Sequence, residues 1–196
     1  KKVTKMIVSR ITGGLGNQMF QYAIAKSIAK KRNDTFKLDI AFYPKQSLRK
    51  YELNQFSIEG DISLENENKE LSGGEGIFFK IKRKIGFHPQ RPESYFPEKE
   101  TSIFDKEVFK YKDNIYLDGY WQNEAYFKDI RTELLKDFTL KNKISDKAKK
   151  YLDDIKNRQS VSIHIRRGDY ITNSHTNGIH GSCDLNHYKK AVTYVR

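Results

Sequence analysis

The first forty residues carry a strand, a glycine turn, a helix and a second strand in immediate succession. Residues 5–11 alternate loosely and are rich in β-formers, as in a buried strand, and residues 13–18 form the turn. Apolar side chains then recur at helical spacing from Met19 to Ile28, and residues 35–40 predict the second strand. Because strands joined by a crossover helix pair in parallel, this order predicts an α/β fold with a parallel sheet.

Later segments continue this alternation. Residues 114–121 predict a strand that ends in aromatic residues. Asn123 is then a candidate cap for a helix that runs to Phe138. A charged helix is expected over residues 145–156, and a last helix is expected after its cap at Asp184. These later segments therefore fit an α/β pattern.

Two segments in the middle of the chain depart from the pattern. Residues 65–76 are polar, acidic and glycine-containing, which predicts a loop. Residues 76–85 combine basic and apolar side chains. That combination suits either a packed helix with outward lysines or an amphipathic helix at a membrane surface.

A short polar run at residues 156–159 is the expected domain boundary. Residues 1–157 predict an N-terminal Rossmann-like domain, and residues 158–196 predict the start of a C-terminal domain. The second part carries a single expected βα unit, since residues 160–165 predict a strand and a helix follows the polar loop at 172–182. We therefore expect this second domain to be truncated in the chain.

The charge balance bears on the class of partner. The formal net charge is +12, which attracts polyanions such as nucleic acid, anionic lipid or nucleotides. The excess is mostly lysine spread along the chain, so a general basic surface and a dedicated polyanion patch both remain open. No apolar run approaches the roughly 20 residues that a membrane helix needs. Cys183 is the only cysteine, which rules out an intrachain disulfide and fits a reducing compartment.

The glycine turn is a candidate phosphate or sugar site. Gly14 and Gly16 let the backbone approach a ligand, and the N-terminus of the following helix attracts anions. Asn17 and Gln18 add two side-chain amides that bond hydroxyls or phosphate oxygens. Met19 stands where a dinucleotide fingerprint has its third glycine, which weakens that fingerprint. The alternative is a tight turn capped by Asn17.

The second candidate site follows the predicted strand at residues 160–165. Arg166 and Arg167 are adjacent guanidinium groups whose forked donors suit a diphosphate. Asp169 and His164 flank them. A strand that ends in charged residues delivers them to the carboxyl edge of a sheet, where open α/β folds bind ligands. The alternative is a structural ion pair between an arginine and Asp169, with His164 bonded to the backbone.

Two further groups admit a ligand-binding interpretation. His175, His180, Cys183 and His187 are zinc-binding residue types, but their spacing matches no standard zinc pattern, so we expect no metal site. Tyr120 and Trp121 lie at the end of a predicted strand. They fit either a stacking surface for a sugar ring or the hydrophobic core.

Several motifs together resemble one family. The sequence GGLGNQMFQYA at residues 13–23 resembles the opening of the α-1,2-fucosyltransferases of glycosyltransferase family 11. So does SIHIRRGDY at residues 162–170. Shorter similarities lie in the family's order between and after these two: LDI at 38–40, KYEL at 50–53, GYWQ at 119–122 and HGSCDL at 180–185. The last of these is typical of the bacterial branch.

The resemblance implies an architecture and a reaction. It implies GT-B, with two Rossmann-like domains facing across a cleft, no essential metal and no cofactor. Residues 1–157 would be the acceptor-side domain, and residues 158–196 would begin the donor domain that binds GDP-fucose. The reaction would be an inverting transfer of L-fucose from GDP-fucose to the 2-hydroxyl of a β-galactoside, in the synthesis of a surface glycan such as O-antigen or capsule. The acceptor would be a galactose-containing oligosaccharide or lipid-linked glycan. The expected location is the bacterial cytoplasm, with peripheral contact at the anionic inner face of the membrane.

The resemblance also assigns roles. Arg166 or Arg167 would hold the pyrophosphate, and we favour Arg167 for stabilising the charge that develops as GDP leaves. Asp169 and His164 would position that arginine or the nucleotide. Gly14, Gly16, Asn17 and Gln18 would reach the donor from the first domain. The general base stays open between Asp118, Asp169, His164, His175 and the departing phosphate. Family members continue well beyond residue 196, so we expect a polypeptide of this length to be inactive or nearly so.

Two other functions compete with this one. A nicotinamide-dependent Rossmann oxidoreductase would use the glycine turn and Asp39 as its ribose-binding acid, but Met19 and the paired arginines argue against it. A basic nucleic-acid-binding protein would use the positive charge, but no helix-turn-helix or zinc-finger pattern supports it. We therefore expect no nucleic-acid partner.

Overall fold

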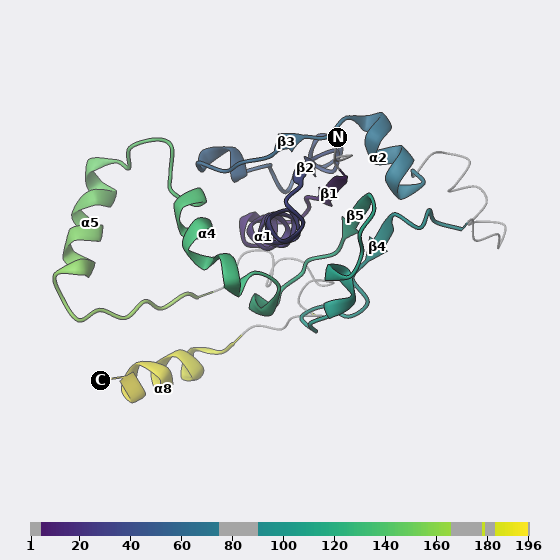
Figure 1. The fold of residues 1–196 in the computed structure, drawn as a ribbon. Coiled ribbons are helices and arrows are strands. Elements are labelled where there is room, and N and C mark those ends of the chain that lie inside the picture. Colours follow the sequence, from purple (N-terminus) through teal and green to yellow (C-terminus); the bar gives the residue numbers. More distant parts are fainter. Residues whose placement is uncertain (1–4, 75–89, 166–177, 179–182, 196) are drawn as a thin grey trace. The chain divides into compact units, whose positions relative to one another are not determined.

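The computed structural model describes residues 5–74, 90–165, 178 and 183–195, and these divide into two compact units, Lys1–Lys143 and Ile144–Arg196 (Figure 1). The first unit is built on a five-stranded sheet in the order β3-β2-β1-β5-β4, with every neighbouring pair parallel. The strands are β1 (Met6–Arg10), β2 (Thr35–Asp39), β3 (Asp61–Ile62), β4 (Tyr95–Pro97) and β5 (Ile115–Asp118). The predicted parallel α/β sheet is therefore confirmed.

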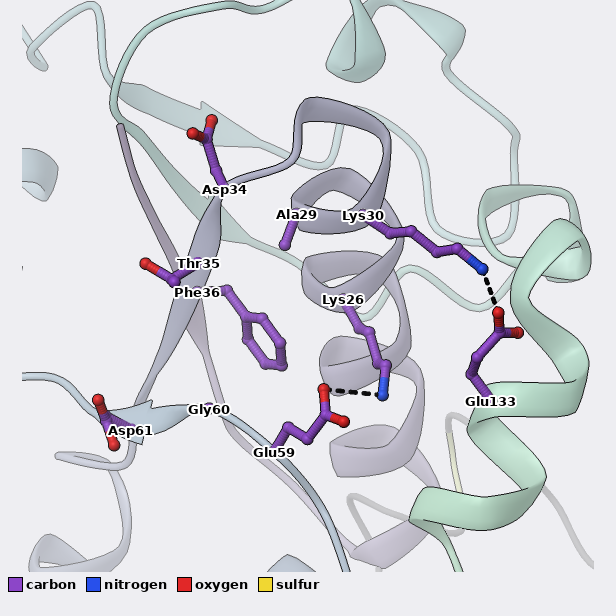
Figure 2. Close-up of a pocket in the computed structure, with 10 residues that line it drawn as sticks. All are labelled: Lys26, Ala29, Lys30, Asp34, Thr35, Phe36, Glu59, Gly60, Asp61 and Glu133. Atoms are coloured by element: carbon purple, nitrogen blue, oxygen red, sulfur yellow. Dashed lines mark hydrogen bonds and ion pairs between the residues drawn. The ribbon is translucent and has the colours of Figure 1, made fainter. Parts of the chain in front are cut away.

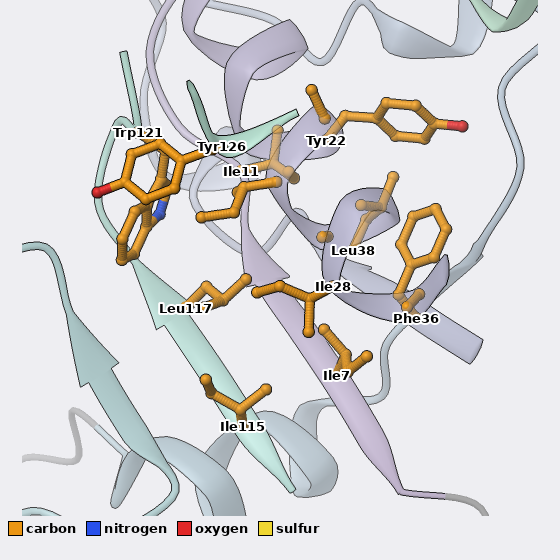
Figure 3. Close-up of a cluster of buried hydrophobic side chains, with 14 of the residues drawn as sticks. Ile7, Ile11, Tyr22, Ile28, Phe36, Leu38, Ile115, Leu117, Trp121 and Tyr126 are labelled. Carbon is orange, nitrogen blue, oxygen red and sulfur yellow. The ribbon is translucent and has the colours of Figure 1, made fainter. Parts of the chain in front are cut away.

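Helices cover both faces of this sheet. Helix α1 (Leu15–Arg32) packs on β1 and β2, and α2 (Glu65–Ser72) packs on β5 (Figure 1). Side chains alternate across a strand, so Ile7 joins the core under α1 while its neighbour Val8 packs with Leu71 of α2. The larger core also takes in aromatic rings from loops beyond the sheet, including Trp121 and Tyr126 (Figure 3).

The glycine turn begins α1 as predicted. Gly13 has φ +76°, a left-handed conformation that glycine adopts without strain, and Gly14 is extended. The helix ends where Asn33 takes the left-handed conformation, at φ +53°, after three basic residues. Asparagine is the residue after glycine that most readily caps a helix this way.

The prediction of a loop at residues 65–76 is wrong, because Glu65–Ser72 forms helix α2. Its acidic first turn suits the positive end of a helix, and Glu67 Oε2 accepts a hydrogen bond from the N–H of Leu64 at 2.8 Å. Gly73 then ends the helix at φ +77°. Leu71 alone provides a large apolar contact, so the segment lacks the repeated apolar residues at helical spacing that would predict a helix.

The segment after β5 is less regular than predicted. Asn123 caps as expected, with its side-chain oxygen accepting from the N–H of Ala125, but the turn it caps is 3-10, at Glu124–Tyr126. A second 3-10 turn leads into the short helix α4 (Arg131–Asp137). Other 3-10 turns in the described part of this unit are Tyr43–Lys45, Leu53–Gln55 and Lys106–Phe109.

The second unit contains two predicted helices, α5 (Asp146–Lys156) and α8 (Leu185–Val195). Asp184 caps α8 by accepting from the N–H of His187 at 2.8 Å. The predicted strand at residues 160–165 is absent: this segment is exposed and has no regular secondary structure. A strand needs a hydrogen-bonded neighbour, and the described residues of this unit offer none. The compact units divide after Lys143, ahead of α5, whereas the predicted boundary at residue 157 lies after this helix.

Candidate functional site

Three strands of the first unit end in charged residues at one edge of the sheet. Strands β1, β2 and β5 are parallel neighbours and end at Arg10, Asp39 and Asp118. The glycine turn and the start of α1 follow β1 at the same edge. In open α/β sheets this carboxyl edge is where ligands bind. It is therefore the candidate functional site of the described part of the chain.

Gln18 is buried beneath the glycine turn. Its Nε2 donates to the carbonyl oxygens of Gly13 at 3.2 Å and Lys50 at 2.8 Å, and its Oε1 accepts from the N–H of Glu52 at 2.9 Å. The side chain is fully buried. These hydrogen bonds connect the glycine turn to the loop at residues 50–52. Direct contact between Gln18 and a ligand stays a prediction.

Asn17, Gly14 and Gly16 are more open. Asn17 is half-buried, and its Oδ1 accepts from Nε2 of Gln122 at 2.8 Å. A Cβ added at Gly14 or Gly16 would meet no atom within 4 Å. The backbone at these two glycines thus leaves room for a ligand, which fits the predicted role without testing it.

Gln21 is a positioning residue that sequence reasoning missed. Its Nε2 donates to Thr12 Oγ1 at 3.1 Å and to the carbonyl of Gly119 at 2.9 Å, while its Oε1 accepts from the N–H of Thr12 at 2.9 Å. The side chain is fully buried. An amide buried in an apolar helix face needs polar partners, and that was the available signal. With Asn17 and Gln18, it makes the first turns of α1 the anchor for three loops.

One of these loops, residues 119–122, is held from its other side by Glu98. Its carboxylate accepts from the N–H of Tyr120 at 2.7 Å and from the N–H of Trp121 at 3.0 Å. Trp121 has φ +57°, a conformation that strains a bulky residue, and its ring is fully buried. Of the two aromatics that the sequence left open, Trp121 belongs to the core and Tyr120 is exposed.

A polar cluster closes this edge between β1, β4 and β5. Arg10 Nη1 lies 3.2 Å and 3.1 Å from the two carboxylate oxygens of Asp118, and the hydroxyl of Tyr95 donates to Asp118 Oδ2 at 2.6 Å. Burial, together with the adjacent Asp118, raises the pKa of Tyr95 to about 12. A cavity of about 330 Å³ opens beside this cluster.

The side chain of Asp39 is not accessible to a ribose. Its Oδ2 accepts from the hydroxyl of Tyr116 at 2.6 Å and its Oδ1 accepts from the N–H of Ala41 at 2.9 Å. The residue is only 6% exposed. A ribose-binding acid must be accessible to the ligand, so the burial of this carboxylate argues against the nicotinamide alternative.

A larger cavity, of about 510 Å³, lies near the opposite edge, where β2 and β3 begin (Figure 2). Its two lysines are paired with lining carboxylates: Lys26 with Glu59 at 3.0 Å, and Lys30 with Glu133. Lys26 also contacts the buried Asp137 at 2.5 Å. Since both lysines of this cavity are held in ion pairs within the protein, we regard it as structural.

The predicted arginine site, with Arg166, Arg167 and Asp169, lies outside the described residues, and so does His175. His164 is described and lies exposed in the irregular segment before them. The roles given to these residues stay predictions. Within the described ranges, no group of three or more His, Cys, Asp or Glu side chains is arranged to hold a metal ion. Nor is any helix in those ranges long and apolar enough to cross a membrane.

The sheet, its two helical layers and the glycine turn make the first unit a Rossmann-like α/β fold. The family model of Glycosyl transferase family 11 matches residues 6–196. The chain belongs to this family, as its motifs predicted.

Two relatives in Escherichia coli cover nearly all of the chain. An alpha-1,2-colitosyltransferase is 32% identical over 97% of this chain and 64% of its own length. The O-antigen biosynthesis glycosyltransferase WbnK is 30% identical over 95% of this chain and 67% of its own length. Galactoside alpha-(1,2)-fucosyltransferase 2 of Hylobates lar is 26% identical over 81% of this chain and 40% of its own length. The chain thus spans about two thirds of its bacterial relatives. No solved structure matches it.

Proposed function

We propose that the protein transfers L-fucose from GDP-fucose to the 2-hydroxyl of a β-galactoside, with inversion at the fucose carbon. The observation that carries this proposal is its family membership, over residues 6–196. Relatives that cover most of the chain are named for α-1,2 transfer of colitose and of fucose. A shared linkage in relatives that carry different sugars supports the 2-hydroxyl as the point of attachment.

The donor would be held from two sides. Arg166 and Arg167 suit the diphosphate, and Arg167 would stabilise the charge that develops on the leaving GDP. Asp169 and His164 would orient these groups. From the first unit, the open backbone at Gly14 and Gly16, with Asn17 beside it, would face the donor at the start of α1. Binding of the donor by residues of both domains would require a GT-B arrangement with a complete second domain.

The geometry narrows the choice of general base. Both oxygens of Asp118 already accept hydrogen bonds, and Arg10 holds it as a charged partner. Protonating Asp118 during the reaction would weaken that ion pair. We therefore favour Asp169, His164 or His175, or the departing phosphate, over Asp118 as the acceptor of the hydroxyl proton.

Colitosyl transfer is the second candidate, favoured by the name of the relative with 32% identity. The two differ in the sugar carried by the donor and share the linkage. An O-antigen role is proposed from the name of WbnK. Such an acceptor would lie near the inner membrane face, where the net charge of +12 would favour peripheral contact with anionic lipid.

The test is a transfer assay on the full-length gene product, with GDP-fucose and an activated colitose as donors and a β-galactoside as acceptor. We expect fucose transfer to the 2-hydroxyl, unchanged by EDTA and reduced at least about a hundredfold by Arg167→Ala. Calorimetric binding of GDP, with NAD and ADP as controls, checks the donor separately. Selective NAD binding, or steeply salt-dependent DNA binding without transfer, would refute the proposal in favour of the two competing functions.

A further inference from the structure

Helix α5 exposes an apolar face. Its apolar side chains are spaced three and four residues apart, which places them on one side of the helix: Ala148, Tyr151, Leu152 and Ile155. All 11 residues of the helix are exposed, and the exposed fraction is 60% for Tyr151 and 56% for Ile155. A helix this short is marginal in water unless its apolar face is covered. The exposed face therefore indicates a binding surface.

Lysines lie along both borders of this face. Residues four apart are neighbours on a helix, so Lys147 lies beside Tyr151 on one border. Lys156 lies beside Leu152 on the other border for the same reason. The aliphatic part of a lysine side chain lies along an apolar surface while its ammonium group stays in water. The face is thus apolar in its centre and basic at its borders.

The opposite side of α5 carries acidic residues. Asp146 and Asp153 lie there, on either side of Lys150. Asp154 lies between that side and the border at Lys147. A helix with an apolar face, basic borders and an acidic far side suits a surface of anionic lipid. There its apolar face enters the boundary between headgroups and acyl chains, and its lysines meet the lipid phosphates.

The charge of the surrounding segment agrees with this surface and argues against two other occupants. Residues 141–158 contain seven basic and three acidic residues, a net charge of +4. A nucleic acid would bind the basic groups but gain nothing from the exposed Leu152 and Ile155. A second copy of α5 would bring rows of border lysines together, and facing like charges repel. An anionic lipid surface matches both the apolar and the basic groups.

We propose that α5 binds an anionic lipid surface, with Leu152 and Ile155 entering the headgroup boundary and Lys147 and Lys156 binding lipid phosphates. The inference rests on the proposed function, which includes peripheral contact with the membrane, and it assigns that contact to one helix. The residues of α5 belong neither to the candidate functional site nor to the predicted arginine site. Membrane binding and sugar transfer can therefore be separated by mutation.

The experiment measures co-sedimentation of the full-length protein with phosphatidylcholine vesicles, with and without about one third phosphatidylglycerol. We expect binding to the anionic vesicles, weakened at least about tenfold by Leu152→Ala combined with Ile155→Ala, since alanine preserves the helix and removes apolar area. Lys147→Gln combined with Lys156→Gln should weaken binding by about tenfold or more, because each lysine near an anionic surface contributes about fivefold. Lys150→Gln is the matched control on the far side of the helix and should change binding less than about threefold.

Several results would overturn the inference. Equal binding to neutral and anionic vesicles would remove the role of the lysines, and wild-type binding by both double variants would remove the role of α5. A lower midpoint of thermal unfolding in the double alanine variant, with unchanged vesicle binding, would show that the face packs within the protein. A wild-type dimer that this variant loses in vesicle-free buffer would show that the face binds a second copy. If the alanine variant does not fold, the lysine variants decide, since their side chains are exposed.

Transfer to a soluble β-galactoside separates this inference from the proposed function. In that assay the α5 variants should keep the wild-type kcat/KM within about twofold. If the wild type transfers no sugar but binds anionic vesicles through α5, the proposed function has failed and the inference stands. If transfer is normal and the variants bind vesicles as the wild type does, the inference alone has failed.

Discussion

At the scale of single residues, Asn17 and Gln18 are adjacent amides that the sequence treats alike, and the structure separates their tasks. Gln18 is fully buried and makes three hydrogen bonds to backbone groups of two loops. Asn17 is half-buried and makes one side-chain bond, to Gln122. Stability and ligand binding should therefore respond differently at the two positions.

We predict that Gln18→Ala lowers the free energy of unfolding by about 2–4 kcal/mol, because it leaves buried carbonyl and N–H groups unpaired. Asn17→Ala should cost less than about 1 kcal/mol, yet reduce the transfer rate if Asn17 faces the donor. Urea unfolding midpoints measure the first effect and steady-state rates the second. Equal destabilisation by both substitutions would contradict this separation.

At the scale of elements, the loop 119–122 is fixed by partners distant in the sequence. Glu98 binds two successive N–H groups of the loop, and Gln21 binds the carbonyl of Gly119. A Cβ at Gly119 would lie 2.3 Å from the Cβ of Glu98, so the two segments approach as closely as glycine allows. The strained backbone of Trp121 depends on these bonds.

Glu98→Gln should loosen this loop, because an amide can accept from one N–H with its oxygen but turns its own NH₂ toward the other. We expect a loss of about 2–3 kcal/mol in unfolding free energy, because one of the two buried bonds to the loop is lost. Glu100→Gln is the matched control: it is nearby and exposed, and its side chain has no such contact. If Glu98→Gln and Glu100→Gln give the same midpoint of thermal unfolding, Glu98 does not fix the loop.

Local patterns in the sequence were sufficient for the βαβ unit and for the caps at Asn123 and Asp184. They missed α2, whose stabilising contacts are largely polar, and they predicted a strand at 160–165 that has no partner in the described part of its unit. The roles of Gln21 and Glu98 could not be predicted because both bind the loop at 119–122, which is distant in the sequence. Which residues share an edge follows from the sheet order, and a single sequence does not reveal that order.

At the scale of the first unit as a whole, three tyrosine–aspartate hydrogen bonds connect its elements, two between strands of the sheet and one between α1 and α4. Tyr22 donates to Asp137 at 2.7 Å, Tyr116 to Asp39 at 2.6 Å, and Tyr95 to Asp118 at 2.6 Å. In each case burial is the largest cause that raises the tyrosine pKa, and the carboxylate adds to it. These hydroxyls therefore stay protonated in the fold at pH values where an unfolded chain would lose the protons.

This linkage predicts alkaline unfolding. Below about pH 10 both states keep the tyrosine protons, so the stabilisation is fully present. As the pH rises above 10, the unfolded state ionises first, and each of the three tyrosines should reduce stability by about 1.4 kcal/mol per pH unit. For Tyr95 this loss is complete above its folded pKa of about 12. Denaturant titrations from pH 8 to 12 should thus show stability falling from pH 10, and falling less steeply in Tyr95→Phe. A slope in Tyr95→Phe equal to that of the wild type would show that Tyr95 ionises freely in the fold.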